Sequence, residues 1–458
     1  MMTKGTVYRA LTYTMNNHHP KLLIADKKGC VYDVPFLSAA GMKCGEYFRL
    51  FPRNLIKLPS DSELFMLPER FPIGYDSDKR CFVRVKRNPL IKNNEPCYAV
   101  AAFLSPGYTA TYNAAYFQSK KTNKLPLFSY SAVVFYKDEF YAAGIRLDSE
   151  KRQALIGMDI KIVRKNVKLF EKIFPENRLV RHLETCALTY GCPAAKNFFL
   201  KRYEGPLPSS PLCNARCIGC ISYQPGKNCS STQPRITFVP TPEEISSIAL
   251  FHIKNAADPV VSFGQGCEGE PLLAGKILEE AIKRVRKKTA KGIINLNTNA
   301  SKPDILRRLF RAGLDSIRVS INSFQKEYYE KYYKPKDYAL KDVLRSIKIA
   351  KTEGAFVSIN YLVMPGFTDS SEEIKALSKF LCKQEIDIIQ WRNLNYDPIS
   401  YFKELGIESE QNNMAGIETL IRKIKKDYPR IMHGYFNPSR RRIRRYKARA
   451  DRRSYLQG

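Results

Sequence analysis

Three cysteines stand close together near the middle of the chain, in the segment Cys213-Asn-Ala-Arg-Cys217-Ile-Gly-Cys220. Zinc sites usually take four protein ligands, commonly as two separated pairs. Three close thiolates instead suit a cubane iron–sulfur cluster in which one iron has no protein ligand. The spacing therefore favours a 4Fe-4S cluster with one iron open to another molecule, and the alternative is three reduced structural thiols.

The composition sets limits on the class of protein. The chain of 458 residues is 44% hydrophobic and 26% charged, which is ordinary for a soluble protein of more than one domain. No apolar run is long enough for a membrane span, and no export signal follows Met1, so we expect a cytoplasmic protein. In that compartment the 12 cysteines are expected to be metal ligands or buried thiols rather than disulfides.

The elements that must position the cysteines follow them in the sequence. From Thr241 to about Asn395, strands expected at 260–264, 292–299, 315–322, 356–363 and 386–393 alternate with amphipathic helices, including 302–312, 341–353 and 371–383. This alternation predicts a parallel sheet covered by helices. Thr241-Pro-Glu-Glu244 and Ser370-Ser-Glu-Glu373 are predicted to be capping boxes that start two of the helices.

Polar residues recur on one face of the expected strands. Side chains alternate between the two faces of a strand, so Arg318, Ser320 and Asn322 share a face. The same spacing occurs in three other strands, at Asn295, Asn297 and Asn299, at Ser358 and Asn360, and at Gln390 and Arg392. A closed barrel filled by its own side chains would be apolar there. We therefore favour a lumen that holds a polar ligand over an open sheet with one wetted face.

The cysteine segment resembles the CxxxCxxC signature of the radical S-adenosylmethionine (SAM) superfamily, and it precedes βα units as in that family. The resemblance covers about residues 208–395 and implies an α/β fold, a partial (β/α)6 TIM-like barrel of the radical SAM type. It also implies that Cys213, Cys217 and Cys220 hold a 4Fe-4S cluster whose open iron chelates SAM. One electron from the cluster then cleaves SAM to the 5′-deoxyadenosyl radical. Gly219 departs from the pattern, because the family often has an aromatic residue just before the third cysteine.

The resemblance also implies a set of SAM-binding residues. The segment Gly264-Gln-Gly-Cys-Glu-Gly-Glu-Pro271 is similar to the family's glycine–glutamate segment, which receives the SAM amino group. Glu270, after Gly269, is the first candidate for this contact and Glu268 the second, because a carboxylate can pair with an ammonium group. The remaining candidates lie on or after the later strands: Asn297, Thr298, Asn299, Arg318, Ser320, Asn360, Gln390 and Arg392.

Four more cysteines lie around the cysteine segment and the glycine-rich segment, namely Cys186, Cys192, Cys229 and Cys267. They are interpreted either as a second iron–sulfur cluster or structural metal site, or as ordinary thiols. The five histidines show no ligand spacing.

We divide the sequence into an N-terminal α+β domain of unknown role (1–184), a radical SAM core (185–435) and a basic C-terminal tail (436–458). The tail holds nine basic residues between Arg440 and Arg453, and the whole chain carries a net charge of +32. The expected protein is a radical SAM oxidoreductase or transferase with an unknown small-molecule, peptide or RNA substrate and an electron donor such as flavodoxin or ferredoxin. Two alternatives stay open: an RNA-modifying enzyme anchored by the tail, and a non-catalytic iron–sulfur or metal-binding module.

Overall fold

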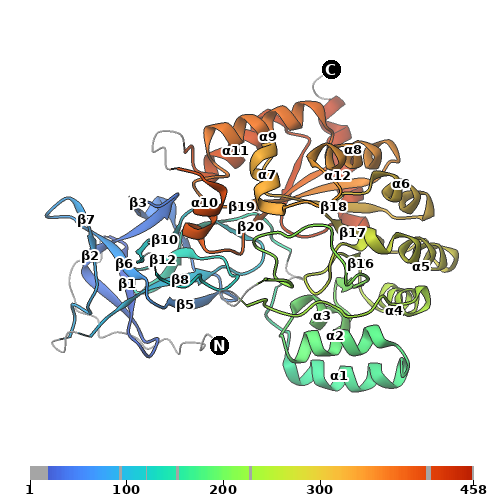
Figure 1. Cartoon of the computed structure of the whole chain (residues 1–458), viewed down its shortest axis with the longest axis horizontal. Helices are drawn as coiled ribbons and strands as arrows, with labels where there is room; N and C mark the ends of the chain where they lie inside the picture. The colour runs from blue at the N-terminus through green and yellow to red at the C-terminus, as the bar shows by residue number, and fades with distance from the viewer. Residues whose placement is uncertain are drawn as a thin grey trace.

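The computed structural model describes residues 19–91, 95–119, 121–150, 154–225, 230–408 and 414–455. Figure 1 shows two lobes side by side, a lobe of strands and a larger lobe of strands covered by helices. We call residues 21–146 the β domain and residues 160–455 the barrel domain. No helix in the described ranges is long and apolar enough to cross a membrane.

The β domain is built from short antiparallel strands, of which twelve form one sheet within the described residues. Lys137 and Asp138, with φ of 49° and 60°, make the tight turn of the hairpin that the sequence predicted at this point. The strands are β1 Lys21–Ala25, β2 Val31–Lys43, β3 Glu46–Arg49, β4 Ile56–Lys57, β5 Glu63–Leu67, β6 Phe71–Asp76, β7 Cys81–Arg84, β8 Tyr98–Phe103, β9 Tyr108–Ala110, β10 Asn113–Ala114, β11 Tyr116–Phe117, β12 Ser131–Tyr136, β13 Glu139–Ala142 and β14 Gly144–Arg146.

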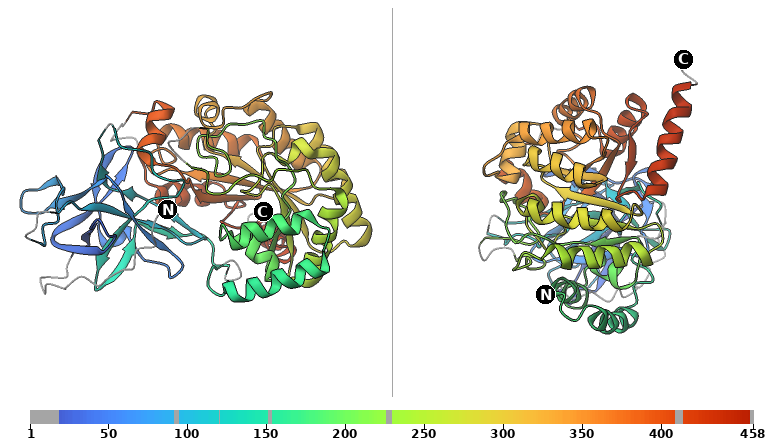
Figure 2. Two further views of the ribbon diagram at one scale, coloured as in Figure 1. Left: turned by 60° about the horizontal axis from the view of Figure 1, so that its bottom comes forward. Right: turned by 90° about the vertical axis from the view of Figure 1, so that its right-hand side faces the viewer.

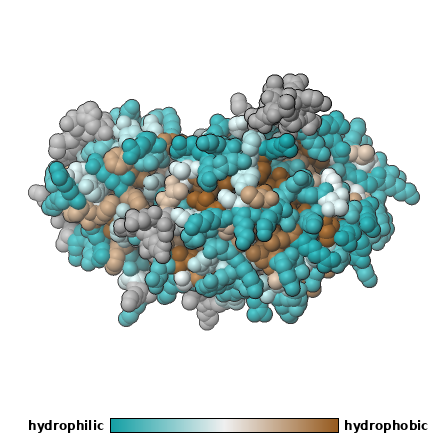
Figure 3. Space-filling model, turned by 90° about the horizontal axis from the view of Figure 1, so that it is seen from above, coloured by the Kyte–Doolittle hydropathy of each residue, from teal (hydrophilic) through white to brown (hydrophobic). Residues whose placement is uncertain are grey.

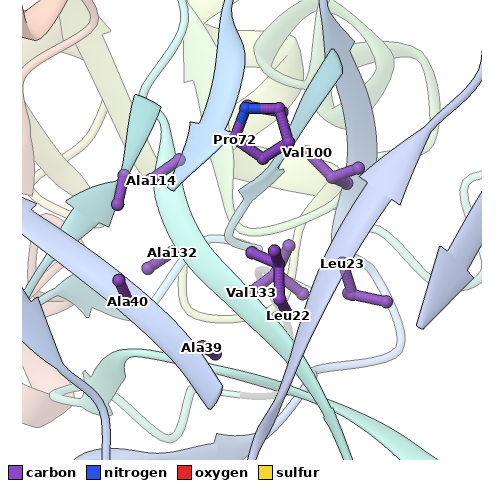
Figure 4. Close-up of a pocket in the computed structure, with 11 residues that line it drawn as sticks. Leu22, Leu23, Ala39, Ala40, Pro72, Val100, Ala114, Ala132 and Val133 are labelled. Atoms are coloured by element: carbon purple, nitrogen blue, oxygen red, sulfur yellow. The ribbon is translucent and has the colours of Figure 1, made fainter. Parts of the chain in front are cut away.

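A small pocket lies inside the β domain (Figure 4). Its lining is aliphatic, with Leu22, Val100 and Val133 among the side chains that face it. Apolar side chains offer a ligand no hydrogen bonds, and every lining residue belongs to the β domain. The pocket is therefore a packing gap and no part of the candidate site.

Three helices follow the β domain: α1 Ile160–Ile173, α2 Arg178–Leu188 and α3 Pro193–Phe199. The apolar faces of α1 and α2, with Val163, Phe170 and Leu183, belong to the hydrophobic cluster that also contains the barrel helices. Figure 2 shows these helices against the barrel. The predicted boundary at residue 184 falls inside α2, whereas the packing changes between Arg146 and Ile160.

The barrel domain contains a parallel sheet with strand order β15-β16-β17-β18-β19-β20-β21 in the described residues, which confirms the predicted partial barrel. The five longer strands are those expected from the sequence, whereas the three-residue strands β15 and β21 were not predicted. The strands are β15 Glu204–Pro206, β16 Val260–Phe263, β17 Ile293–Thr298, β18 Ser316–Ile321, β19 Phe356–Val363, β20 Ile388–Asn393 and β21 Met432–Gly434. The helices are α4 Pro242–Asn255, α5 Gly275–Lys288, α6 Pro303–Ala312, α7 Lys326–Tyr333, α8 Leu340–Thr352, α9 Ser371–Lys383, α10 Pro398–Leu405, α11 Ile417–Asp427 and α12 Arg440–Tyr455.

One of the two predicted capping boxes is complete. Thr241 and Glu244 exchange both hydrogen bonds at the start of α4. At α9, Ser370 accepts a hydrogen bond from the Glu373 backbone, but the Glu373 side chain does not return it. Its carboxylate instead points into the core, where it accepts hydrogen bonds from Ser323 Oγ and Tyr361 Oη, both at 2.6 Å. The second capping box was therefore wrong, because burial of Glu373 brings it other donors.

The β domain contacts the barrel domain at the carboxyl ends of β19 and β20. Asn393, the last residue of β20, donates a hydrogen bond to the Tyr108 carbonyl and accepts one from the Ala110 backbone in β9. The loop after β19 carries Asp369, which forms a buried ion pair with Lys43 of β2 at 3.1 Å. Ligands bind at the carboxyl ends of parallel strands in such folds, so the β domain lies over one side of the candidate site.

Replacing Lys43 with Met should destabilise the folded chain by about 3–5 kcal/mol, because the Asp369 carboxylate would stay buried without its partner. Urea unfolding followed by fluorescence measures the change. The exposed pair of Lys57 and Glu139 is the control: both side chains are about half exposed, at 66% and 46%, so Lys57→Met should cost less than about 1 kcal/mol. Equal losses in the two variants would contradict the assigned role of the buried pair.

The basic segment at the carboxyl end forms α12, which stands along one edge of the molecule (Figure 2). Its first turn is attached to the domain: Arg442 pairs with Asp148 at 3.1 Å, and Arg440 pairs with Asp315 at 3.3 Å. Ile443 packs on an apolar cluster that includes Val260. The face of the molecule in Figure 3 is mostly hydrophilic, with hydrophobic residues recessed between rows of hydrophilic ones.

Candidate active site

The three cysteines of the predicted cluster lie between β15 and α4, and all three are half-buried. Burial raises the pKa of Cys213 to about 11, and the nearby charges of Glu270 and Cys220 contribute to the rise. Burial and the charges of Cys220 and Cys213 likewise raise the pKa of Cys217. The three thiol groups are therefore close enough to interact electrostatically.

Helix α7 holds the cysteine loop in place. The backbone amides of Arg216 and Ile218, which flank Cys217, donate hydrogen bonds to the carbonyls of Tyr333 and Tyr332, at 2.9 and 3.0 Å. The Tyr332 hydroxyl lies only 2.8 Å from the position that a Cβ on Gly219 would take. The aromatic residue expected beside the third cysteine is thus supplied from α7.

Asn214, inside the cysteine loop, joins it to the carboxyl end of β17. Its amide donates to Ser301 Oγ at 3.0 Å, and its carbonyl oxygen accepts a hydrogen bond from Asn299 Nδ2 at 2.9 Å. Asn299 was predicted to bind SAM, and the structure shows that its side-chain amide positions the cysteine loop.

Arg235 lies beside the cysteine loop and was not predicted. Its Nη2 is 3.5 Å from Cys220 Sγ, and its Nε donates a hydrogen bond to Ser222 Oγ at 3.1 Å. A guanidinium group stabilises negative charge on nearby thiolates. Arg235 comes 15 residues after Cys220, and no motif around it distinguishes it from the other arginines of this basic chain.

The glycine–glutamate segment runs directly beside the cysteine loop. The amides of Gly269 and Glu270 donate hydrogen bonds to the carbonyls of Ser210 and Leu212, both at 2.7 Å. A Cβ on Gly269 would lie 2.0 Å from the Leu212 carbonyl oxygen, so no other residue fits there. The two segments are therefore one structural unit.

The Glu270 carboxylate is buried at the carboxyl end of β17. It accepts hydrogen bonds from Thr298 Oγ1 at 2.5 Å, from the Asn299 amide at 2.8 Å and from the Leu272 amide at 3.1 Å. A carboxylate has about four acceptor positions, so one is left for a ligand. Burial raises the pKa of Glu270 to about 7. The structure thus brings together the predicted residues Glu270, Thr298 and Asn299.

Glu268, the second candidate, fastens the segment before the cysteines. Its carboxylate accepts four hydrogen bonds: from the backbone and hydroxyl of Ser209, and from the backbone amides of Ser210 and Gln265. Burial raises its pKa to about 7. Three of these hydrogen bonds go to Oε2 and one to Oε1. Glu268 thus has one more donor than Glu270, which favours Glu270 over Glu268 as the contact for a ligand.

Replacing Glu268 with Gln should lower stability by about 1–3 kcal/mol, because the new amide group would face a backbone donor that then loses its acceptor. Thermal unfolding of the full chain is the measurement. Glu280→Gln is the matched control, since Glu280 makes an exposed ion pair with Arg284 and should cost less than about 1 kcal/mol. An unchanged melting temperature in Glu268→Gln would show that this carboxylate does not hold the loop.

The predicted polar rows lie in register across the sheet. Arg318 pairs with Ser358, Ser320 with Asn360, and Asn360 with Gln390. Among the described residues, Arg318 Nε, Ser358 Oγ and Asn360 Oδ1 are buried without a hydrogen-bond partner. Burial lowers the pKa of Arg318 to about 10, with the charge of Arg392 adding to the shift, so Arg318 stays protonated at neutral pH. The Arg318 cation suits an anionic group of a ligand. The unpaired oxygens of Ser358 and Asn360 can accept hydrogen bonds from its polar groups.

Asn437, in the segment after β21, fills part of the lumen. Its carbonyl oxygen accepts a hydrogen bond from Gln390 Nε2 at 3.0 Å, and its amide donates to Glu204 Oε1 at 2.8 Å and Asn297 Oδ1 at 3.3 Å. Arg392 donates to the Tyr435 carbonyl at 2.9 Å. The side chains of Asn297, Gln390 and Arg392 therefore already have protein partners. Asn437 was assigned to the basic tail, and no pattern in the sequence singles it out.

The structure brings together part of the predicted second cysteine group. Cys186 in α2 and Cys267 in the glycine-rich segment are buried beside each other, and the Cys192 amide donates to the Cys186 carbonyl at 2.9 Å. A hydrogen bond from Cys267 lowers the pKa of Cys186 to about 5 and raises that of Cys267. His182 joins this group, which the sequence did not predict. Cys229 lies outside the described residues.

The fold and the site define a partial α/β barrel with a three-cysteine loop beside a glycine–glutamate segment. Residues 207–380 match the family described as the radical SAM superfamily. The chain therefore contains a radical SAM domain, whose cofactors are a 4Fe-4S cluster and SAM. Radical SAM domains belong to enzymes that need an electron donor and a substrate.

Two curated proteins are similar to part of the chain. The GTP 3′,8-cyclase of Aquifex aeolicus is 34% identical over 169 residues, which are 37% of this chain and 49% of the cyclase. An uncharacterised protein of Methanocaldococcus jannaschii is 29% identical over 167 residues, which are 36% of this chain and 56% of that protein. The chain thus spans about half the length of these relatives.

Two solved structures are similar to part of the chain at low identity. SuiB of Streptococcus suis, bound to the precursor peptide SuiA, is 14% identical, with a TM-score of 0.36, 67% of this chain covered and 69% of SuiB. A radical SAM methyltransferase from Sphaerobacter thermophilus is also 14% identical, with a TM-score of 0.35, 45% of this chain covered and 65% of the methyltransferase.

Proposed function

We propose that the chain is a radical SAM enzyme in which Cys213, Cys217 and Cys220 hold the 4Fe-4S cluster and Glu270 receives SAM. The observation that carries the proposal is the direct attachment of the glycine–glutamate segment to the cysteine loop, through the Glu270 amide and the Leu212 carbonyl at 2.7 Å. Of the two buried carboxylates in the segment, Glu270 has fewer hydrogen-bond donors and is the one whose backbone is bonded to Leu212, directly before Cys213. A reducing compartment such as the cytoplasm suits these free cysteines.

When bound, the cluster and SAM supply a one-electron cleavage that yields the 5′-deoxyadenosyl radical. The chain's own residues are proposed to bind and orient SAM. Glu270 pairs with the ammonium group of SAM, and Arg318 in the lumen attracts its carboxylate. Ser320 and Asn360, adjacent in the sheet, are proposed to face the ribose. Arg235 beside Cys220 stabilises the added negative charge when an electron arrives from a donor such as flavodoxin or ferredoxin.

The substrate is proposed to enter between the two domains. The β domain contacts the carboxyl ends of β19 and β20, where the Lys43–Asp369 pair and the hydrogen bonds of Asn393 join the domains. Its residues therefore contribute to the wall of the space above the lumen. The substrate can be a small molecule, a peptide or RNA. The arginines at the start of α12 form ion pairs within the chain, so this turn does not favour RNA.

Anaerobic reconstitution with iron and sulfide, followed by dithionite and SAM, tests the proposal. An enzyme should release 5′-deoxyadenosine, whereas a non-catalytic metal-binding module should release none. Intact SAM in the presence of a fully reduced cluster would overturn the assignment. The unpaired polar groups of the lumen favour the enzyme, because a module that only binds metal has no use for them.

A further inference from the structure

We infer that His182, Cys186 and Cys267 form a second metal site, for one zinc ion, apart from the cysteine triplet. The ligand atoms of the three residues all lie within 4.8 Å of one another. His182 Nε2 is 3.5 Å from Cys186 Sγ. Neither the family match nor the resemblance to radical SAM enzymes assigns metal to these residues.

The spacing of the ligand atoms decides between one ion and a cubane. In a tetrahedral zinc site with bonds of about 2.0–2.3 Å, neighbouring ligand atoms stand about 3.3–3.8 Å apart. The thiolates of a cubane hold different irons and therefore stand further apart than the ligands of one ion. The His182 group is compact enough for a single ion, so the second iron–sulfur cluster considered from the sequence is not the form that this geometry favours.

The ligands come from two rigid elements. His182 and Cys186 are four residues apart on α2, so their side chains share one face of the helix. Cys267 lies opposite them in the glycine-rich segment, where its carbonyl accepts a hydrogen bond from the Ile236 amide at 2.8 Å. Two ligands on one helix and a third on a fixed loop form a site that needs little rearrangement to bind an ion.

Cys192 is the proposed fourth ligand, and its side chain would turn toward the ion, because its sulfur is not in the group of ligand atoms that lie within 4.8 Å of one another. It caps the start of α3, and its amide donates to the Cys186 carbonyl at 2.9 Å. Its sulfur is close enough to those of Cys186 and Cys267 to interact with them electrostatically. Imidazole and thiolate ligands suit zinc, and four protein ligands close the site, as is usual for structural zinc.

The proposed ion connects α2 to the segment that carries Glu268 and Glu270. Cys267 directly precedes Glu268, whose carboxylate holds the backbone of Ser209 and Ser210. The zinc site would thus fix the amino-terminal helices to the loop that meets SAM. Its residues touch neither substrate nor SAM, so they are positioning residues.

Metal analysis of the full-length chain tests the site. Protein made with added zinc, purified anaerobically and reconstituted with iron and sulfide should contain about one zinc and about four irons per chain. Cys186→Ser and His182→Gln should each lose at least about nine-tenths of the zinc and keep the iron. The control Cys97→Ser, a buried thiol of the β domain, should keep both metals. The triple alanine variant of the cysteine triplet should keep zinc and lose iron, which separates this site from the proposed SAM chemistry.

Three results would overturn the inference. They are about eight irons with no zinc, zinc retained in the double variant Cys186→Ser/Cys267→Ser, and a disulfide between Cys186 and Cys267 in freshly prepared protein. If the variants fail to fold, cobalt replaces zinc in the parent chain. Thiolate-to-cobalt absorption bands that disappear with a chelator support the site, and their absence refutes it.

Discussion

Alanine in place of Cys217 should reduce the formation of 5′-deoxyadenosine below detection. Each thiolate of the triplet is proposed to hold one iron, and two thiolates cannot retain the cubane. The loop itself should persist, because the amides of Arg216 and Ile218 stay bonded to α7 through Tyr333 and Tyr332. The loss should therefore be one of iron and activity and not of folding. Iron content, circular dichroism and product analysis after anaerobic reconstitution measure the three properties.

The same outcome is expected for alanine at Cys213 or Cys220. Cys97→Ala is the matched control, since Cys97 is a buried thiol of the β domain that donates a hydrogen bond to the Val85 carbonyl at 3.4 Å. It should keep its iron and its activity. If any of the three triplet variants formed product at the rate of the parent, these residues would not be the ligands of the cluster.

Glutamine in place of Glu270 should weaken SAM binding by about 10- to 100-fold, because a hydrogen bond to a charged group contributes about 1.5–3 kcal/mol. The iron content should stay near that of the parent, since the hydrogen bond from the backbone amide of residue 270 to the Leu212 carbonyl does not depend on the side chain. Titration calorimetry of the reconstituted protein with SAM measures the affinity. Glu280→Gln, on the exposed face of α5, is the control and should bind SAM as the parent does.

The pH dependence of SAM binding gives a second measurement on Glu270. Burial raises the pKa of this carboxyl group to about 7, so it gains its charge as the pH rises through neutrality. Affinity for the SAM ammonium group should therefore increase from about pH 6 to about pH 7.5 in the parent and stay flatter in Glu270→Gln. Equal SAM affinity in the parent and in Glu270→Gln over this pH range would show that another residue contacts the ammonium group.

Much of the barrel domain could be predicted because its signals are local. The strict alternation around Arg318 and Ser320 marks a strand by itself, and the Thr241 capping box marks a helix start. The β domain offers no such signal. Strands as short as β4, with Ile56 and Lys57, or β10, with Asn113 and Ala114, exist only because distant strands pair with them. Their positions depend on tertiary contacts that a window of sequence does not contain.

The candidate site divides in the same way. Cys213, Cys217, Cys220 and Glu270 stand in compact motifs, so spacing and residue type were enough to find them. Asn437 reaches the lumen from 140 residues beyond Asn297, and Arg235 reaches Cys220 from another loop. His182 had one local signal, its four-residue spacing from Cys186 on a helix face. That signal alone does not define a metal site, because the third partner, Cys267, is far away in the sequence.

Gly219 and Tyr332 have a consequence for how such chains diverge. The Tyr332 hydroxyl occupies the space that a side chain on Gly219 would need, at 2.8 Å from the Cβ position. An aromatic residue at position 219 would require the Tyr332 side chain to move. In evolutionary terms the two positions should covary: a relative with an aromatic residue before its third cysteine should have a small residue where this chain has Tyr332. The aromatic ring next to the third cysteine can therefore come from either of two positions in the sequence. A search with the cysteine motif alone would treat this chain as an exception.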